Sequence, residues 1–231
     1  MAAQRSLILA VFAVLIAGGA CAEKGNQVQT GQARDTVDEV IALPAPARTG
    51  SVSLEEALAR RRSVRDFSAE PLTDQQLGQL LWAAQGITSA EGMRTAPSAG
   101  ALYPLEMYVA LARGFFHYDP QRHELHRMSA LDLRPGLCRA ALEQEAVLKA
   151  PAVFLIAAVY ERTASKYGPE RAPRYVHLEA GHAAQNLLLQ AVALGLGGVP
   201  VGAFQDAQLQ KAASLPAGQQ PLYLIPVGHP R

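Results

Sequence analysis

The feature that most constrains the fold is a long apolar helix predicted over residues 172–194. Apolar residues occupy most of its sides, so we expect it to be covered from several directions and to lie centrally in the domain. Residues 152–160 form a near-continuous apolar run, which is typical of a strand buried on both faces of a sheet. A central helix beside such a strand predicts a layered fold around one core.

Two helices are predicted from their capping signals. Ser53 and Glu56 form a capping box that opens a helix running into a cluster of arginines. Thr73 and Gln76 form a second capping box. It opens a helix with apolar residues at positions 77, 80, 81 and 84, and Gly86 is expected to end that helix.

The remaining elements predict a small, mostly antiparallel sheet. Residues 105–112 and 222–227 have strand patterns, and 115–118 and 124–127 flank Asp119-Pro120 as a hairpin. Helices are also expected over 131–147, with a break at Pro135, and over 206–213. Helices that flank a sheet of this kind define an α+β layered fold.

Composition supports one folded domain that begins near Ser51. The chain has 231 residues, of which 49% are hydrophobic and 18% are charged, so a well-buried core is expected instead of disorder. The formal net charge is +1, which provides no overall field for sequence-independent binding of nucleic acid.

The N-terminus has the pattern of an export signal. Arg5 provides the positive start, and residues 7–17 are an unbroken apolar run that is too short to span a membrane comfortably. Ala20-Cys21-Ala22 fits a cleavage site that releases the protein, whereas residues 18–21 resemble a bacterial lipobox after which Cys21 carries a lipid. We favour the lipoprotein, because a polar tether follows. The expected organisation is a signal peptide over 1–22, a linker over 23–50 and a folded domain over 51–231, located in the cell envelope.

Four arginines lie within six residues, at positions 60–62 and 65. Leu54, Leu58 and Arg61 are spaced i, i+4 and i+7, which predicts that Arg61 shares a helix face with two leucines. A guanidinium that faces a core is costly unless it meets a carboxylate or a phosphate, so a bound anion is one interpretation. The other is a helix C-terminus whose cations, Arg60 and Arg62, are solvated and favour the helix dipole.

Two loops rich in small residues are candidate ligand contacts. Residues 95–104 allow a flat ligand to approach the backbone closely, with Ser98 offering a hydroxyl and Tyr103 a ring. Residues 195–204 contain several glycines but lack the spacing and the preceding strand of a dinucleotide-binding motif. Their exposed backbone amides can donate hydrogen bonds to a heterocycle.

Glu179, His182, Asn186 and Gln190 form a polar stripe on the predicted central helix. The spacing of Glu179 and His182 fits half of a bundle metal site, but the required second pair does not occur in the sequence. Buried, hydrogen-bonded polar groups are therefore the favoured interpretation, and no metal is predicted.

Several of these stretches, in their order and spacing, resemble the nitroreductase family. They are Arg61–Phe67, Pro97–Pro104 and Gly195–Phe204. Lys166-Tyr167-Gly168, Arg174–Asn186 and the ending Ile225–Pro230 resemble the SagB-type dehydrogenase branch of that family. The resemblance covers residues 43–231. It implies an α+β fold, FMN as the cofactor, and a homodimer with FMN at its interface.

The resemblance also implies roles for residues at matched positions. Arg61, Arg62, Ser63 and Arg65 would hold the FMN phosphate and ribityl chain, and Arg231 would be a late phosphate contact. Pro97, Ser98, Ala99 and Gly100 would line the flavin ring from the partner subunit. Val201, Gly202 and Ala203 would face the reactive edge of the ring.

Lys166 and Tyr167 resemble the acid–base pair of the azoline-oxidising members, in which an azoline loses a proton and a hydride and FMN takes the hydride. A lysine base needs burial that favours its neutral form. The alternative is that Lys166 is a solvated loop residue.

The expected function is two-electron transfer through FMN on an azoline-like, quinone or nitro substrate. Nicotinamide donors are scarce outside the cytoplasm, so oxygen, a quinone or another envelope acceptor is expected to reoxidise the flavin. The alternative is an envelope lipoprotein that binds a flavin or another ligand without catalysis.

Overall fold

The computed structural model of the chain describes residues 39–231, so the predicted signal peptide, Cys21 and much of the predicted linker lie outside it. Seven strands form one sheet in the order β1-β4-β3-β2-β5-β7-β6, and every neighbouring pair is antiparallel. The strands are β1 (Val40–Ala42), β2 (Leu105–Leu111), β3 (Gly114–Asp119), β4 (Glu124–Ser129), β5 (Ala152–Val159), β6 (Gly197–Gly198) and β7 (Gln219–Gly228).

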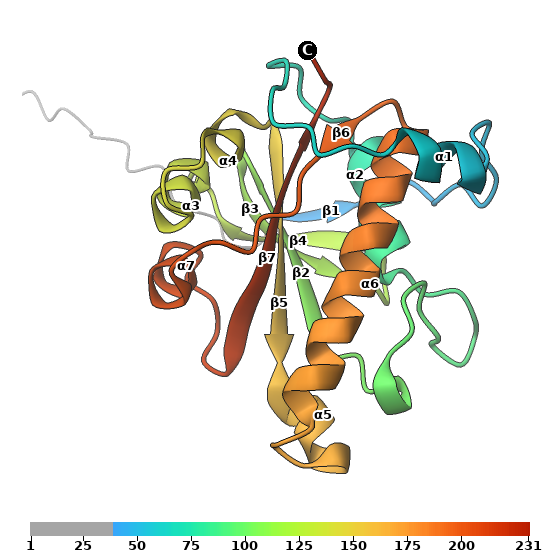
Figure 1. Cartoon of the computed structure of the whole chain (residues 1–231), viewed down its shortest axis with the longest axis vertical. Helices are drawn as coiled ribbons and strands as arrows, with labels where there is room; N and C mark the ends of the chain where they lie inside the picture. Colours follow the sequence, from blue (N-terminus) through green and yellow to red (C-terminus); the bar gives the residue numbers. More distant parts are fainter. Residues whose placement is uncertain (1–38) are drawn as a thin grey trace, which may run out of the picture. The chain divides into compact units, whose positions relative to one another are not determined.

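Helices cover both faces of this sheet, as Figure 1 shows. One face carries α2 (Asp74–Gln85) and α6 (Ala172–Ala193), and the other carries α3 (Arg134–Ala140), α4 (Glu145–Lys149) and α7 (Asp206–Ala212). The remaining helices are α1 (Leu54–Arg60), the short 3-10 helix η1 (Ala99–Ala101) and α5 (Tyr160–Tyr167). The predicted α+β layered fold is confirmed.

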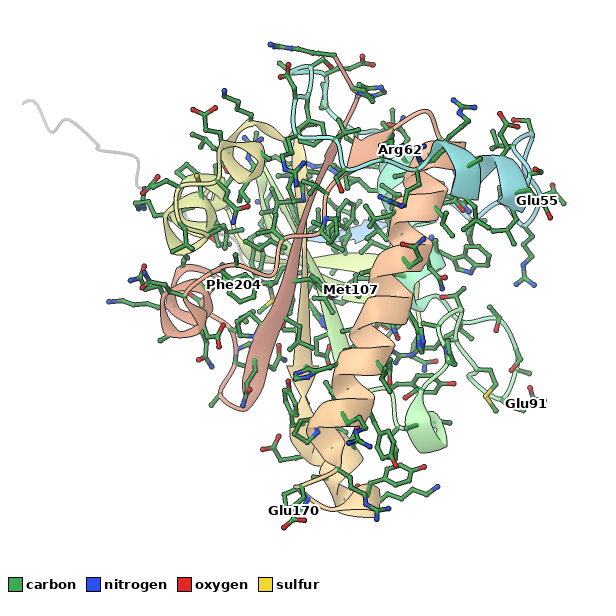
Figure 2. All side chains as sticks on the ribbon, viewed as in Figure 1. Glu55, Arg62, Glu91, Met107, Glu170 and Phe204 are labelled. Carbon is green, nitrogen blue, oxygen red and sulfur yellow. The ribbon has the colours of Figure 1, made fainter. Side chains whose placement is uncertain are left out.

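β5 separates two apolar cores, because its side chains alternate between the two faces. Phe154 and Ile156 belong to the core beneath α2 and α6, where Met107 also lies near the centre of Figure 2. Val153 and Leu155 belong to the core beneath α3, α4 and α7. Each such side chain contributes about 1.5–3 kcal/mol relative to exposure, which explains why this strand is apolar on both faces.

The predicted start of α2 is confirmed in detail. The Thr73 side chain accepts a hydrogen bond from the Gln76 amide, and the Gln76 side chain accepts one from the Thr73 amide. The apolar positions of this helix pack against α6, and Gly86 is its C-cap. The predicted central helix is also confirmed, since α6 ends one residue before its predicted limit.

The prediction for the first helix was wrong about which face is buried. Ser53 caps α1 as expected, but the Glu56 carboxylate pairs with Arg60 instead of completing the capping box. Leu54 and Leu58 are 62% and 52% exposed. Arg61 is the C-cap with non-helical ψ, so no helical stripe turns it toward the core.

Two further expectations are corrected. The helical break in residues 131–147 does not lie at Pro135, which instead stands in the first turn of α3, where a missing N–H costs nothing. The break lies at Leu142 and Glu143, which both adopt φ near +57° between α3 and α4. Lys166 is not a loop residue, because it belongs to the last turn of α5.

Candidate functional site

The arginine segment is fixed against β6, near the C-terminal end of α6. The Val64 amide donates to the Gly198 carbonyl at 3.1 Å, and Ser63 forms a parallel bridge with Gly198. A Cβ at Gly197 would lie 2.7 Å from the Val64 side chain, so only glycine permits this close approach. This contact places Ser63 and the neighbouring arginines on the surface at that end of the helix.

The arginines of this segment differ in their partners. Arg60 forms an ion pair with Glu56 at 2.7 Å, and Arg62 donates to the carbonyls of Ala59 and Arg61 at 3.0 and 2.7 Å. Arg60 and Arg62 therefore interact with groups of α1 and its C-terminal end, as one of the two interpretations predicted.

Arg61 and Arg65 are the free guanidinium groups of the segment. Within residues 39–231, neither side chain forms a hydrogen bond or an ion pair with another residue. Arg231 lies close by, because its amide donates to the Asp66 carbonyl at 3.3 Å. The structure thus brings together the basic residues that the sequence places at opposite ends of the domain.

The loop over residues 97–100 contacts Lys166 and Tyr167. Gly100 has φ +64°, and a Cβ there would lie 3.0 Å from both the Lys166 Nζ atom and the Tyr167 hydroxyl. The Ser98 hydroxyl accepts a hydrogen bond from the Tyr103 amide at 2.9 Å, which closes the turn. The candidate ring-lining loop and the candidate acid–base pair therefore form one cluster.

Lys166 is exposed, and Tyr167 is half-buried against Tyr175, with their ring centroids 4.8 Å apart. The Lys166 Nζ atom lies 5.7 Å from the centroid of the Tyr167 ring. The shielding from water that a lysine base needs is thus not supplied by this chain alone.

A cavity with a volume of about 700 Å³ lies between α5, the start of α6 and β7. Gly202 lines it, as do Tyr160 and His177, whose hydroxyl and Nε2 atoms are 2.6 Å apart. Burial, followed by the charge of Asp206, raises the pKa of Tyr160. Sequence reasoning missed this pair. The only signal was a tyrosine at the end of a predicted strand and a histidine one turn inside a predicted helix.

Val201, Gly202 and Ala203 follow β6 toward this cavity. Val201 is buried and pairs with Leu224 of β7, which fixes the segment to the sheet. Gly202 and Ala203 are exposed, and neither N–H donates a hydrogen bond to another residue within 39–231. The exposed amides that the sequence predicted are thus present, and their contact with a flavin stays a prediction.

The side chains of the polar stripe on α6 differ in whether they have hydrogen-bond partners. Asn186 donates to the Thr95 carbonyl at 3.3 Å, and Gln190 accepts from Gln79 at 3.2 Å. Glu179 is 2% exposed, and its Oε1 atom has no hydrogen-bond partner among the described residues. Among residues 39–231, no three side chains of the metal-ligating types are grouped to hold an ion.

The two halves of the candidate site lie near opposite ends of α6. Figure 2 shows Arg62 near the end where the arginines meet β6, and Glu170 at the end that follows Lys166 and Tyr167. α6 has 22 residues, which at 1.5 Å per residue span about 33 Å. The loop over 97–100 lies beside α6 residues 175–182, and the 11 residues from His182 to Ala193 span roughly 16 Å.

The sheet order and the helices on both of its faces place the chain in the nitroreductase-like α+β class. The nitroreductase family model matches residues 58–229. A protein of Methanocaldococcus jannaschii named as a nitroreductase is 45% identical over 183 residues, which cover 77% of this chain and 91% of that protein. The chain belongs to the nitroreductase family and is an oxidoreductase of that family.

Solved structures agree with this assignment. A crystal structure from Ralstonia eutropha, also named as a nitroreductase, matches with a TM-score of 0.76 at 33% identity, over 85% of this chain and 91% of that chain. The NADPH:FMN oxidoreductase of Vibrio harveyi matches with a TM-score of 0.57 at 25% identity, over 77% of this chain and 68% of that chain.

Proposed function

We propose that this chain is an FMN-dependent oxidoreductase whose flavin site is shared between two copies of the chain. The observation that carries the proposal is the separation of the two halves of the site along α6. A mononucleotide anchored at Arg61 would have to reach along this helix to meet Gly100 of the same chain, so a second copy is the more direct source of the loop. A symmetric dimer allows the loop of one copy to approach the arginines of the other.

The residues present fit FMN at each part of the molecule. Arg61 and Arg65 have no acidic partner among the described residues, and forked guanidinium groups suit a phosphate. Ser63 offers a hydroxyl beside them. The free amides of Gly202 and Ala203 can donate hydrogen bonds to the edge of a ring. The Vibrio harveyi relative carries FMN in its name, which supports the same cofactor here.

When bound, FMN would supply two-electron transfer, and the chain would supply binding, orientation and proton handling. The cavity of about 700 Å³ beside Gly202 is the proposed place for the substrate. There the hydrogen-bonded Tyr160–His177 pair offers a hydroxyl and an imidazole to a bound molecule.

Exposed apolar side chains support the proposed homodimer. Leu54 and Leu58 on α1 and Leu178 on α6 are 62%, 52% and 55% exposed. A cavity of about 350 Å³ lies between α1, α2 and α6 and includes Leu54 in its wall. A second chain on this side would bury these side chains, which are otherwise unfavourable in water.

The more specific proposal is a SagB-type dehydrogenase. Its support is the contact of Lys166 and Tyr167 with the loop at Gly100, which brings the candidate acid–base pair to the proposed flavin. An azoline-like substrate would lose a proton to this pair and a hydride to FMN. A quinone or nitro compound is the alternative substrate class. The competing function is a flavin-binding protein without turnover.

The proposed location is the cell envelope, with Cys21 carrying a lipid. The proposal rests on the sequence of residues 1–22, which lie outside the described part of the chain. No helix within residues 39–231 is long and apolar enough to cross a membrane. Mass spectrometry of the N-terminal peptide tests this: a diacylglyceryl mass on Cys21 supports it, and a free terminus after Ala22 contradicts it.

The cofactor is tested by titrating purified protein with FMN and following the quenching of flavin fluorescence. Arg61→Ala should weaken binding about 10- to 150-fold, because a charge-assisted hydrogen bond contributes about 1.5–3 kcal/mol. Arg60→Ala is the matched control, since Arg60 is paired with Glu56, and it should bind as the wild type does. Equal losses in the two variants, or no binding by the wild type, would refute the proposed site.

The sharing of the site is tested by mixing two inactive variants. A dimer of one Arg61→Ala chain and one Lys166→Ala chain has one intact site if Arg61 and Lys166 come from different copies. Random mixing should then restore about a quarter of the wild-type activity. If both residues serve the site of their own chain, every site is damaged and the mixture stays inactive.

A further inference from the structure

A buried carboxyl lies behind the loop that the proposed function places against the flavin. Glu179 comes from α6 and is 2% exposed. It lines a cavity of about 280 Å³ together with Pro97, Ser98 and Ala99 of the loop. Its Oε1 atom has no hydrogen-bond partner among the described residues, which is unusual for a buried oxygen.

The side chains that face Glu179 come from three parts of the chain. Ser98 from the loop and Gln85 from α2 lie close enough to favour the carboxylate weakly. Arg94 is the one cation that acts on it directly, and Tyr103 stacks on that guanidinium, with its ring centroid 4.6 Å from the Arg94 Cζ atom. These groups surround the carboxyl without forming a hydrogen bond to Oε1.

The Arg94 charge is divided between two carboxyls. Arg94 donates to the Gln85 side-chain oxygen at 2.9 Å, and its charge acts on Glu106 as well as on Glu179. Burial opposes ionisation of Glu106, but His117 at 2.7 Å and the ion pair with Arg162 still lower its pKa. Glu106 is therefore the ionised member, and Glu179 shares the charge of Arg94 with it.

Burial has the opposite outcome at Glu179. Loss of solvation is the largest effect there, and it raises the pKa of Glu179 to about 7, against the weaker influences of Ser98, Arg94 and Gln85. The cavity that reaches this carboxyl is also lined by Tyr175 and by His182, which is exposed. A proton can thus pass between Glu179 and solvent without an opening of the core.

We propose that Glu179 is a positioning residue that holds a proton behind the flavin loop, so that its ionisation disfavours a flavin that has accepted electrons. This inference rests on the proposed function, because that function places the loop over 97–100 against the ring. Protonated Glu179 keeps the wall behind Ser98 neutral. Ionised Glu179 adds a poorly solvated negative charge, which opposes the negative charge that a flavin gains with electrons.

The size of the effect follows from Coulomb's law. If a charge on Glu179 acts on the ring across a separation on the order of 8 Å, at an effective dielectric constant between about 20 and 40, it changes the affinity about 5- to 30-fold. Between about pH 6 and 8.5, the ratio of the affinities for reduced and oxidised FMN should fall by this factor in the wild type.

The experiment measures the midpoint potential of the bound flavin across this pH range, by equilibration with a reference dye. The wild type should show a change of slope near neutral pH, and Glu179→Gln should lack it, because glutamine has the shape of the protonated acid and cannot ionise. Glu170→Gln removes an exposed carboxylate at the same end of α6 and is the matched control, with the wild-type profile. The same profile in Glu179→Gln as in the wild type would overturn the proposal.

An infrared titration of the flavin-free protein separates this inference from the proposed function. The wild type minus Glu179→Gln difference spectrum should show the carbonyl band of a protonated carboxyl at pH 6, and the band should be lost at pH 8.5. An ionised Glu179 at pH 6 would overturn the inference even if FMN binds tightly. A failure of FMN to bind at any pH would overturn the proposed function. It would also overturn the role inferred for Glu179, because that role requires a bound flavin. The infrared band would still report the proton on Glu179.

Discussion

Replacing Glu179 with glutamine should remove a pH-dependent loss of stability from the folded chain. Burial is the largest effect on this carboxyl and raises its pKa from 4.5 to about 7 on folding. Between these values the folded chain binds a proton that the unfolded chain releases. Below the unfolded pKa, Glu179 is protonated in both states and its contribution to the stability of the folded chain is complete. This contribution is lost as the pH rises from the unfolded pKa through the folded pKa.

The magnitude follows from the difference between the two pKa values. One pKa unit corresponds to about 1.36 kcal/mol, so a difference of about 2.5 units makes Glu179 destabilise the folded chain by about 3 kcal/mol at pH 8 relative to pH 4. Glutamine cannot ionise. The free energy of unfolding of Glu179→Gln, relative to the wild type, should therefore rise by about 3 kcal/mol over this range.

Urea unfolding at several pH values measures this difference, with the chain concentration held constant because a dimer gains stability by mass action. Glu170→Gln is again the control, because it removes an exposed carboxylate at the same end of α6. A difference between Glu179→Gln and the wild type that stays constant from pH 4 to 8 would refute the assignment of a proton to Glu179.

Other substitutions test the local structure and the proposed site. Thr73→Ala removes the side chain that caps α2 and should lower the free energy of unfolding by about 1 kcal/mol; an unchanged urea midpoint would show that the cap contributes nothing. Gly100→Ala adds a Cβ at φ +64° that meets Lys166 at 3.0 Å, so it should displace the loop and weaken FMN binding, and an unaltered affinity would argue against contact with the flavin. Lys166→Ala should keep FMN bound but stop turnover, and full activity of this variant would show that Lys166 is not the acid–base residue. Leu54→Ser combined with Leu58→Ser should shift sedimentation toward the monomer, whereas an unchanged sedimentation coefficient would place the dimer interface elsewhere.

The elements that were predicted correctly are those whose pattern has one physical cause. Residues 152–159 are apolar on both faces because each face meets its own core, and no exposed position interrupts the run. The α2 boundaries follow from a cap at Thr73 and a glycine at Gly86, which act within a few residues. Such signals depend on local chemistry, so the sequence is sufficient to find them.

The predictions that failed required information from distant parts of the chain. Helical spacing correctly grouped Leu54 with Leu58, but it does not tell whether the shared face meets a core of the same chain or a surface. Pro135 reads equally well as a break and as a first-turn residue, and only the position of the next helix distinguishes the two.

The candidate site shows the same division. The resemblance supplied Arg61, Gly100 and Lys166 as candidates, but only the fold shows that Gly100 meets Lys166 while the arginine segment meets β6 near the other end of α6. Tyr160 and His177 come from consecutive helices, and nothing in their spacing predicts that they meet beside Gly202. Contacts between elements depend on how those elements pack, which periodicity does not encode.

α6 shows how structural and functional polar residues can be told apart on one helix. Asn186 and Gln190 stand among apolar side chains, but each has a hydrogen-bond partner, and both tie α6 to neighbouring segments. Their polarity is explained by packing alone. Glu179 is more deeply buried than either, and its Oε1 atom has no partner among the described residues, so packing does not explain a carboxyl there. A group that costs stability without a structural gain is expected at a functional position, and Glu179 lies behind the loop over 97–100.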